Sequence, residues 1–210
     1  MPLVYQQNIN DYAKIAVWHI TEPESFFLKE VAIVNEISNS FKRLQHLAGR
    51  YLLKQLEASI SINEILLSIS IKPYLPGNSF HFSITHSGSY AAVIISNKKA
   101  VGIDLELPQQ KINSIKHKFV SAAESAILNV LLLEDFHQHT LAWCIKEAVF
   151  KWYGQGQVDF IKHICIESIT EFENHFHADV VFKKSTDILL KAHAIFFEGY
   201  YMVWVFNEAK

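Results

Sequence analysis

A short run of alternating residues in the middle of the chain constrains the fold most. Residues 101–107 read Val-Gly-Ile-Asp-Leu-Glu-Leu, with an apolar side chain at every second position. This period of two predicts a β-strand with one buried face. Asp104 and Glu106 then project from the same side, with Cα atoms roughly 6.5–7 Å apart. Gly102 beside them leaves room for a ligand or for another backbone.

Two carboxylates on one side of a strand repel each other unless a cation lies between them. Asp104 and Glu106 therefore indicate a site for a divalent metal ion. For this strand taken alone, an edge strand with a solvated acidic face is the simpler interpretation.

The composition limits the class of protein. Half of the 210 residues are hydrophobic and 15 are phenylalanine, which predicts a sizeable packed core in one large domain or two small ones. The 19 Lys and Arg residues against 21 Asp and Glu residues give a net charge of −2. We therefore expect no nucleic-acid partner, and an acidic ligand would need a local basic patch.

Cysteine use and the chain start indicate a cytoplasmic protein. Cys144 and Cys165 form no disulfide framework, and we interpret both as reduced thiols in the core. Residues 1–10 lack the basic start and apolar run of a signal peptide. The most apolar late stretch is interrupted by Glu198 and Gly199, so we expect no membrane partner.

Periodicity predicts an α+β protein. Helices are predicted over residues 21–39, 40–56, 112–120, 121–133 and 140–153. Strands are predicted over residues 15–20, 80–84, 90–96, 101–107, 161–169, 172–182, 188–197 and 200–206, the last four as an antiparallel meander. In each half of the chain the predicted helices come before most of the predicted strands, and the boundary between the two halves lies near residues 97–99. We therefore expect two similar subdomains.

The helix predicted from Ser40 carries basic residues beside its apolar stripe: Lys42, Arg43, His46 and Arg50. A solubilising face is the simpler interpretation of these residues, and a phosphate-binding patch is the alternative.

A polar segment links the strands predicted over residues 80–84 and 90–96. Residues 85–89 read Thr-His-Ser-Gly-Ser, which places Thr85 and His86 among hydroxyl groups at a strand end. Each of these groups can donate a hydrogen bond to an anion. A single loop histidine is nevertheless more often structural.

The helix predicted over residues 140–153 has a second face. Trp143, Glu147 and Lys151 follow at intervals of four and lie along one side. A Glu–Lys pair at this spacing usually means only surface support of roughly a few tenths of a kcal/mol. Three carboxylates around Mg²⁺, with a lysine one helical turn away, would instead fit a diphosphate.

Two motifs here resemble those of the 4′-phosphopantetheinyl transferases. Residues 101–106 resemble that family's G-I-D-[IV]-E motif. Residues 143–151, Trp-Cys-Ile-Lys-Glu-Ala-Val-Phe-Lys, resemble its W-[SC]-x-K-E-A-x-x-K motif, and residues 154–156, Gly-Gln-Gly, continue it.

Three earlier segments extend the resemblance. Residues 82–87 look like the family's F-x-x-S-H-S segment, with Thr85 in place of its first serine. Lys72 resembles the lysine of its G-K-P turn, although Ile71 replaces the glycine. Residues 43–54 look like its basic early helix, and the five segments occur in the family's order.

The length of the chain, about twice that of the small trimeric holo-acyl-carrier-protein synthases, resembles the larger Sfp-type branch. The resemblance implies the 4′-phosphopantetheinyl transferase fold, a pseudo-dimer of two similar α+β subdomains in one chain. We expect an N-terminal subdomain over residues 1–97 on the nucleotide-phosphate side. A C-terminal subdomain over residues 98–210 would hold the metal and catalytic residues, with coenzyme A in the cleft between them. The protein would be a monomer.

The resemblance also implies the roles of individual residues. The ligands of Mg²⁺, or of Mn²⁺ as the alternative ion, would be Asp104, Glu106 and Glu147. Glu147 and Lys151 would be the catalytic residues. The phosphates of the coenzyme A nucleotide would be bound by Lys42, Arg43, Lys72, Thr85 and His86.

The implied reaction transfers 4′-phosphopantetheine from coenzyme A to a serine of an acyl or peptidyl carrier protein and releases adenosine 3′,5′-bisphosphate. The carrier could serve fatty-acid, polyketide or nonribosomal peptide biosynthesis. A non-catalytic module that binds coenzyme A or a carrier is the alternative, and a magnesium-dependent nucleotide phosphohydrolase is a third. Because carrier proteins are acidic, a docking surface is expected at Lys111, Lys116, His117 and Lys118, with an ordinary solvated face as the alternative.

Overall fold

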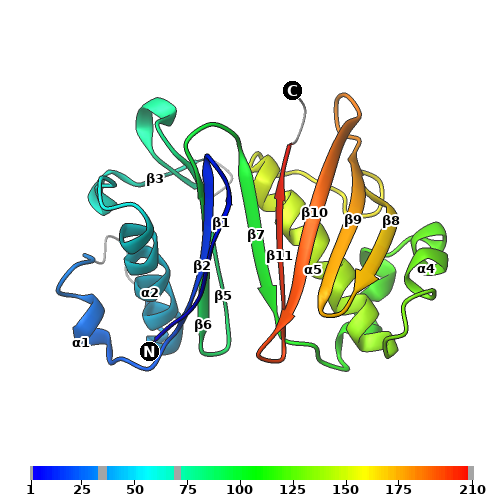
Figure 1. The fold of residues 1–210 in the computed structure, drawn as a ribbon, viewed down its shortest axis with the longest axis horizontal. Helices are drawn as coiled ribbons and strands as arrows, with labels where there is room; N and C mark the ends of the chain where they lie inside the picture. Colours follow the sequence, from blue (N-terminus) through cyan, green and yellow to red (C-terminus); the bar gives the residue numbers. More distant parts are fainter. Residues whose placement is uncertain (1, 33–36, 69–71, 208–210) are drawn as a thin grey trace. The chain divides into compact units, whose positions relative to one another are not determined.

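The computed structural model describes residues 2–32, 37–68 and 72–207 and combines helices with β-sheets (Figure 1). The chain divides into two compact units, Met1–Val101 and Gly102–Lys210. The mixed α and β class predicted from periodicity is confirmed. No helix in the described part of the chain is both long and apolar enough to cross a membrane.

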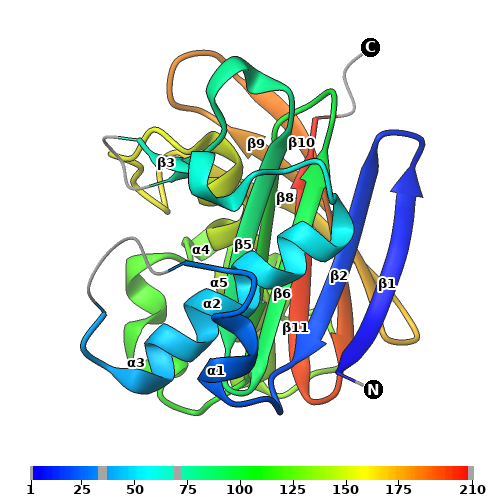
Figure 2. The ribbon, with the colours of Figure 1, turned by 90° about the vertical axis from the view of Figure 1, so that its left-hand side faces the viewer.

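The first unit is a four-stranded antiparallel sheet with one long helix on a face. Its strands are hydrogen-bonded in the order β1 (Leu3–Asn10), β2 (Ala13–His19), β6 (Tyr90–Ser96) and β5 (His81–Ser87). Helix α2 (Ser40–Leu56) lies across this sheet, as Figures 1 and 2 show. The short elements are α1 (Glu24–Phe27), the 3₁₀ turns η1 (Ile62–Glu64) and η2 (Pro76–Asn78), and the strands β3 (Leu66–Leu67) and β4 (Pro73–Tyr74).

Helix α2 combines a capped start with a continuous apolar stripe. The side chain of Asn39 accepts a hydrogen bond from the backbone N–H of Lys42 (2.9 Å), which satisfies one of the free donors at the helix start. Leu47 and Leu52 are fully buried and form one hydrophobic core with Phe82 of β5. The predicted helix and its apolar stripe are confirmed.

The helix predicted over residues 21–39 is largely wrong. Helix α1 has only four residues and no side-chain cap at its start. Thr21 and Glu24 have the spacing of a capping box, which favours a helix start. The carboxylate of Glu24 instead accepts two hydrogen bonds from the Arg43 guanidinium of α2 (2.7 and 3.0 Å). A contact with a distant residue therefore replaces the local capping pattern. Residues 33–36 of this prediction lie outside the described residues.

The connection between β5 and β6 is shorter than predicted. The sequence indicates a linker over residues 85–89, but the ladder continues through Ser87 and leaves two residues in the turn. The first of them, Gly88, has a φ of +52°, in the left-handed region that favours glycine in such turns. Thr85 and His86 therefore lie on a strand and not in a loop.

The second unit is a five-stranded sheet with helix α5 (Asp135–Tyr153) packed across one face (Figure 1). The strands are ordered β7 (Val101–Glu106), β11 (Tyr200–Phe206), β10 (Ile188–Phe197), β9 (His175–Phe182) and β8 (Ile164–Phe172). The predicted antiparallel meander from β8 to β11 is confirmed. The shorter elements are α3 (Ile112–Ile115), the 3₁₀ turn η3 (Lys116–Lys118) and α4 (Ala122–Leu128).

Helix α5 begins earlier than predicted. The sequence indicates a polar break over residues 134–139, yet Gln138 and His139 are buried inside the helix. The Gln138 amide donates to the carbonyl of Leu131 (3.2 Å), and the His139 ring lies 2.6 Å from the amide oxygen of Asn113. Buried polar side chains with partners are compatible with a helix, which hydropathy alone does not indicate.

Local capping rules predict two other helix boundaries correctly. The hydroxyl of Ser121 accepts from the N–H of Glu124 (3.2 Å), and the Glu124 carboxylate accepts from the N–H of Ser121 (2.8 Å), forming a capping box for α4. Gly154 ends α5 with a φ of +69°. In contrast, α4 ends before the predicted residue 133, and the helix predicted over residues 112–120 is divided into α3 and η3.

A buried ion pair joins three elements of the second unit. Lys146 of α5 is fully buried, and its Nζ lies 2.6 Å from a carboxylate oxygen of Glu124. The same ammonium donates to the carbonyls of Phe160 (2.8 Å) and Ile164 (2.7 Å). Glu124 also accepts from the N–H of Ile166 on β8 (3.0 Å). Burial lowers the pKa of Lys146, and the neighbouring Glu124 opposes this shift.

The two cysteines are free thiols that differ in burial. Cys144 of α5 is buried, and its Sγ lies 3.5 Å from the carbonyl oxygen of Tyr201. Cys165 of β8 is only partly buried, because it alternates with the buried neighbours Ile164 and Ile166 and points to the other side of the strand. The prediction of a core position is therefore right for Cys144 and wrong for Cys165.

Candidate functional site

Strand β7 lies directly against the backbone of helix α5 at Gly102. A Cβ atom on this residue would lie 2.0 Å from the carbonyl oxygen of Ala148 and 2.6 Å from the backbone nitrogen of Trp152. Both atoms belong to the helix backbone, so they cannot rotate away as a side chain would. Only glycine allows this contact, which brings the acidic strand directly onto the helix.

The contact places Asp104 beside Lys151. The Nζ of Lys151 lies 2.5 Å from Oδ1 of Asp104, a charge-assisted hydrogen bond. Burial acts to lower the pKa of Lys151, but the charge and hydrogen bond of Asp104, with the charge of Glu147, leave it raised. Asp104 is only 3% exposed, so a solvated acidic face does not describe this strand.

Two further carboxylates share this region of the second unit. The indole N–H of Trp143 donates to Oε1 of Glu106 (3.3 Å). Burial, followed by the charge of Asp104, raises the pKa of Glu106 to about 7. The same two causes raise the pKa of Glu147 to about 7, and the charge of Lys151 opposes both shifts.

The chemistry of this donor set fits a divalent cation. The raised pKa values of Glu106 and Glu147 show that negative charge is unfavourable here, so a metal ion would stabilise their charged forms, and Mg²⁺ prefers such oxygen ligands. Within the described residues, no three His, Cys, Asp or Glu side chains stand close enough together to hold a metal ion. In the structure the Lys151 ammonium contacts the Asp104 carboxylate, so a bound metal ion and Lys151 would both contact Asp104.

Two of the predicted phosphate-binding residues lie near the start of α2. Lys42 is exposed in the first turn. Arg43 is engaged elsewhere, because its guanidinium bonds Glu24 at two points and also donates to the carbonyl of Ile37 (2.7 Å). Arg43 therefore has less capacity left for a phosphate than its position in the sequence indicates.

A basic cluster in the first unit consists of His46, Arg50 and His86. Nη1 of Arg50 lies 3.0 Å from Nδ1 of His46. Burial, followed by the charges of Arg50 and His86, lowers the pKa of His46 to about 4. The sequence predicted His86 as a phosphate-binding residue and named His46 and Arg50 as part of a possible phosphate-binding patch. The spacing of four between His46 and Arg50 places both on one side of α2, off its apolar stripe.

Thr85 and His86 point to opposite faces of the first sheet. Phe82 and Ile84 belong to the core under α2, and alternation along β5 places His86 on that same face. Thr85 is buried on the other face. The sheet therefore separates two side chains that the sequence places next to each other.

Lys72 is half-buried just before β4. Burial lowers the pKa of Lys72 to about 8. The pKa of His81 on β5 is also lowered, first by the burial of His81 itself and second by the charge of Lys72. A half-buried ammonium gains more from a bound anion than a solvated one. The preceding residue, Ile71, lies outside the described residues.

The expected docking residues lie together on one short segment of the second unit. Lys111, Lys116, His117 and Lys118 are all exposed on α3, η3 and the residue before them. Their side chains give this segment a basic surface that an acidic partner could contact.

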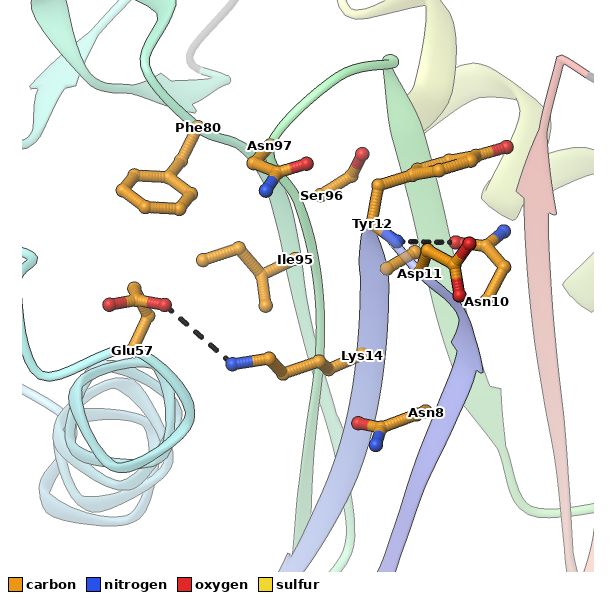
Figure 3. A pocket seen from close by; sticks show the side chains of 11 residues that line it. Asn8, Asn10, Asp11, Tyr12, Lys14, Glu57, Phe80, Ile95, Ser96 and Asn97 are labelled. Atoms are coloured by element: carbon orange, nitrogen blue, oxygen red, sulfur yellow. Dashed lines mark hydrogen bonds and ion pairs between the residues drawn. The ribbon is translucent and has the colours of Figure 1, made fainter.

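Figure 3 shows a cavity of about 400 Å³ in the first unit that contains none of the predicted site residues. Lys14 of β2 points across it toward Glu57, with 3.7 Å between ammonium and carboxylate, and donates to the carbonyl of Leu56 (3.3 Å). The lysine charge is therefore already compensated within the cavity wall.

Comparison with known proteins supports the motif interpretation for the second half of the chain. Residues 100–202 match the family model of the 4'-phosphopantetheinyl transferase superfamily. A protein of Haemophilus influenzae named "Putative 4'-phosphopantetheinyl transferase" is 31% identical over 122 residues, covering 56% of this chain and 52% of that protein. The chain thus spans about half the length of this relative. Residues 100–202 are therefore similar to this superfamily, whereas membership of the whole chain and of the Sfp-type branch stays a prediction.

Proposed function

We propose that this chain is a 4′-phosphopantetheinyl transferase that moves the phosphopantetheine arm of coenzyme A onto a serine of an acyl or peptidyl carrier protein. The observation that carries the proposal is the contact of β7 with α5 at Gly102, because it groups two carboxylates of the strand with Glu147 and Lys151 of the helix. The superfamily match over residues 100–202 includes all of these positions.

The three carboxylates are the proposed metal ligands. Asp104, Glu106 and Glu147 would hold Mg²⁺, or Mn²⁺ as the alternative, through their oxygen atoms. When bound, the ion would offset the charge of the coenzyme A diphosphate and of the leaving group. The raised pKa values of Glu106 and Glu147 support this assignment, because a nearby cation would favour their ionised forms.

Glu147 and Lys151 are the proposed catalytic residues. Glu147 would accept the proton of the carrier serine, directly or through a water that it orients. The Lys151 ammonium, kept charged by Asp104, can donate to the phosphate oxygens as adenosine 3′,5′-bisphosphate leaves. Charge compensation and positioning are the main contributions that phosphoryl transfer requires.

The first unit is proposed to bind the nucleotide phosphates. Lys72 and His86 are the best-supported members of the predicted set, because Lys72 is half-buried and His86 lies beside two further basic groups. Arg43 is less well supported, because its guanidinium is hydrogen-bonded to Glu24. Thr85 is also less well supported, because its side chain lies on the face of the sheet opposite to that of His86.

The test is an assay with apo carrier protein, coenzyme A and Mg²⁺, followed by intact-mass spectrometry of the carrier. We expect the mass gain of one phosphopantetheine arm with the unaltered chain. Asp104→Asn should abolish this gain, and Lys151→Met should lower kcat more than it raises the KM for coenzyme A. Full activity of either variant would contradict the assigned roles.

The same assay separates the two other candidate functions. A non-catalytic module would bind coenzyme A without changing the carrier mass, and a phosphohydrolase would release phosphate without any carrier. We favour neither, because binding alone does not require an Asp104–Lys151 pair whose charges act on both Glu106 and Glu147.

A further inference from the structure

A second polar site lies in the second unit, apart from the carboxylates of β7 and α5. It is a cavity of about 270 Å³ formed by the residues before and at the start of α5, by the turn between β8 and β9, and by β10 and β11. We call it the acidic aromatic pocket. Its lining residues are Leu132, Leu133, Glu134, His137, Glu171, Glu173, Asn174, Phe176, Phe196 and Tyr201.

The floor of this pocket is a packed aromatic cluster. The ring centroid of Tyr201 lies 4.9 Å from that of Phe196 and 5.7 Å from that of Phe176. His137 adds a fourth ring, with its Nδ1 3.1 Å from the Tyr201 hydroxyl. Phe176 and Tyr201 are buried at 2% and 1% exposure and fix the cluster in the core, whereas Phe196 and His137 are only partly buried and are the rings that a ligand could reach. Aromatic faces attract cations and accept the alkyl stem of a long cationic side chain.

The rim of the pocket is negatively charged. Glu134, Glu171 and Glu173 are exposed, and no described residue forms an ion pair with any of them. No lysine or arginine lines the pocket. Three carboxylates above an aromatic floor form a site that is complementary to a single cationic group.

Exposed apolar side chains accompany the pocket. Leu132 on its rim is 99% exposed, and Val130 nearby in the chain is 70% exposed. A small soluble amine would leave both in water, whereas a polypeptide that inserts a cationic side chain could cover them with its neighbouring apolar residues.

We propose that the acidic aromatic pocket binds a lysine or arginine side chain of a basic, apolar segment in a partner protein. An acidic carrier would be repelled by Glu134, Glu171 and Glu173, so this surface serves a different partner from the one proposed for the basic segment of α3 and η3. The inference is therefore independent of the proposed transferase activity.

The test uses the full chain and a fluorescein-labelled octapeptide of alternating leucine and lysine, followed by fluorescence anisotropy. We expect saturable binding that weakens with added salt. The double variant Glu171→Gln/Glu173→Gln should weaken it about fivefold or more. Leu132→Ser should weaken it as well, because the apolar contact is lost. The matched control is Glu64→Gln, which removes one exposed carboxylate of the first unit and should leave the affinity unchanged.

Three outcomes would overturn the proposal. If Glu64→Gln weakens binding as much as the pocket variants do, the peptide responds only to net charge. If a matched peptide of leucine and glutamate binds equally well, charge plays no part. If spermidine displaces the peptide at comparable concentration and Leu132→Ser has no effect, the pocket is a site for a free polyamine and not a docking surface. Circular dichroism of each variant establishes that its fold is intact.

Discussion

Gly102 is the single residue on which the arrangement of the candidate site depends most. We expect Gly102→Ala to lower the free energy of unfolding by about 1–3 kcal/mol, because a methyl group fits only if β7 moves away from the backbone of α5. Gly49→Ala is the matched comparison, since its methyl group would meet a side-chain atom, Cγ2 of Ile84 at 2.6 Å, and not backbone. Urea unfolding measures both. Equal effects of the two substitutions would contradict a backbone-to-backbone contact at β7.

His46 should make stability depend on pH. Its pKa is lowered to about 4 in the folded protein, whereas an ordinary histidine in an unfolded chain titrates near pH 6.5. Between these values the unfolded chain binds more protons, so the contribution of His46 is present above about pH 6.5 and is lost as the pH falls toward 4. His46→Gln should show a smaller fall in the urea midpoint between neutral pH and about pH 4.5. An unchanged fall would contradict this account.

At the scale of elements, the ion pair between α5 and α4 holds part of the second unit together. Lys146→Met should lower the free energy of unfolding by about 3–5 kcal/mol, because it leaves the buried carboxylate of Glu124 without its counter-charge. The double variant Lys146→Met/Glu124→Gln should recover part of this loss, and chemical denaturation measures each. A double variant less stable than Lys146→Met would indicate that the hydrogen bonds of Glu124 to Ser121 and Ile166 matter more than its charge.

The basic segment of α3 and η3 allows a test of carrier docking that rests on the proposed function. Lys116→Glu/Lys118→Glu should raise the KM for an acidic carrier several-fold and leave the KM for coenzyme A unchanged, because both residues are exposed. Lys29→Glu, at an exposed lysine of the first unit, is the control. Steady-state assays against both substrates decide the matter. An unaltered carrier KM would exclude this segment as the docking surface.

For the whole molecule, a metal site should appear as stabilisation by ligand. After treatment with a chelator, added Mg²⁺ should raise the Tm. At a concentration one hundred times its Kd, the ion should raise the free energy of unfolding by about 2.7 kcal/mol. The Asp104→Asn/Glu147→Gln variant should show no such rise, whereas the exposed control Glu64→Gln should behave as the unaltered chain does. Differential scanning calorimetry measures the shift. An equal rise in all three proteins would place the bound ion elsewhere.

Most of the strands could be predicted from the sequence, because alternation is a local property. Residues 101–107, 188–197 and 200–206 were predicted within one residue of the observed strands. The errors have non-local causes. The helix start predicted at Thr21 fails because Arg43, far along the chain, bonds the carboxylate of Glu24. The start of α5 is missed because its polar side chains find buried partners.

The candidate site was predictable only in part. The spacing of four residues places Trp143, Glu147 and Lys151 on one side of a helix, but it gives no information on what that side contacts. The hydrogen bond of Lys151 with Asp104 depends on how β7 packs on α5. The opposite directions of Thr85 and His86 follow from a strand that is longer than its sequence indicates, so a motif-based assignment treats them as one group.

The absence of a side chain at Gly102 has a consequence for how the chain can change over time. Peptide groups of the strand and the helix touch directly, and peptide groups are the same whatever residues surround them. Substitutions elsewhere in the interior can therefore repack without altering the spacing of the acid and the ammonium group. The spacing of Asp104 and Lys151 is thus preserved through substitutions in most of the fold and depends on glycine at one position.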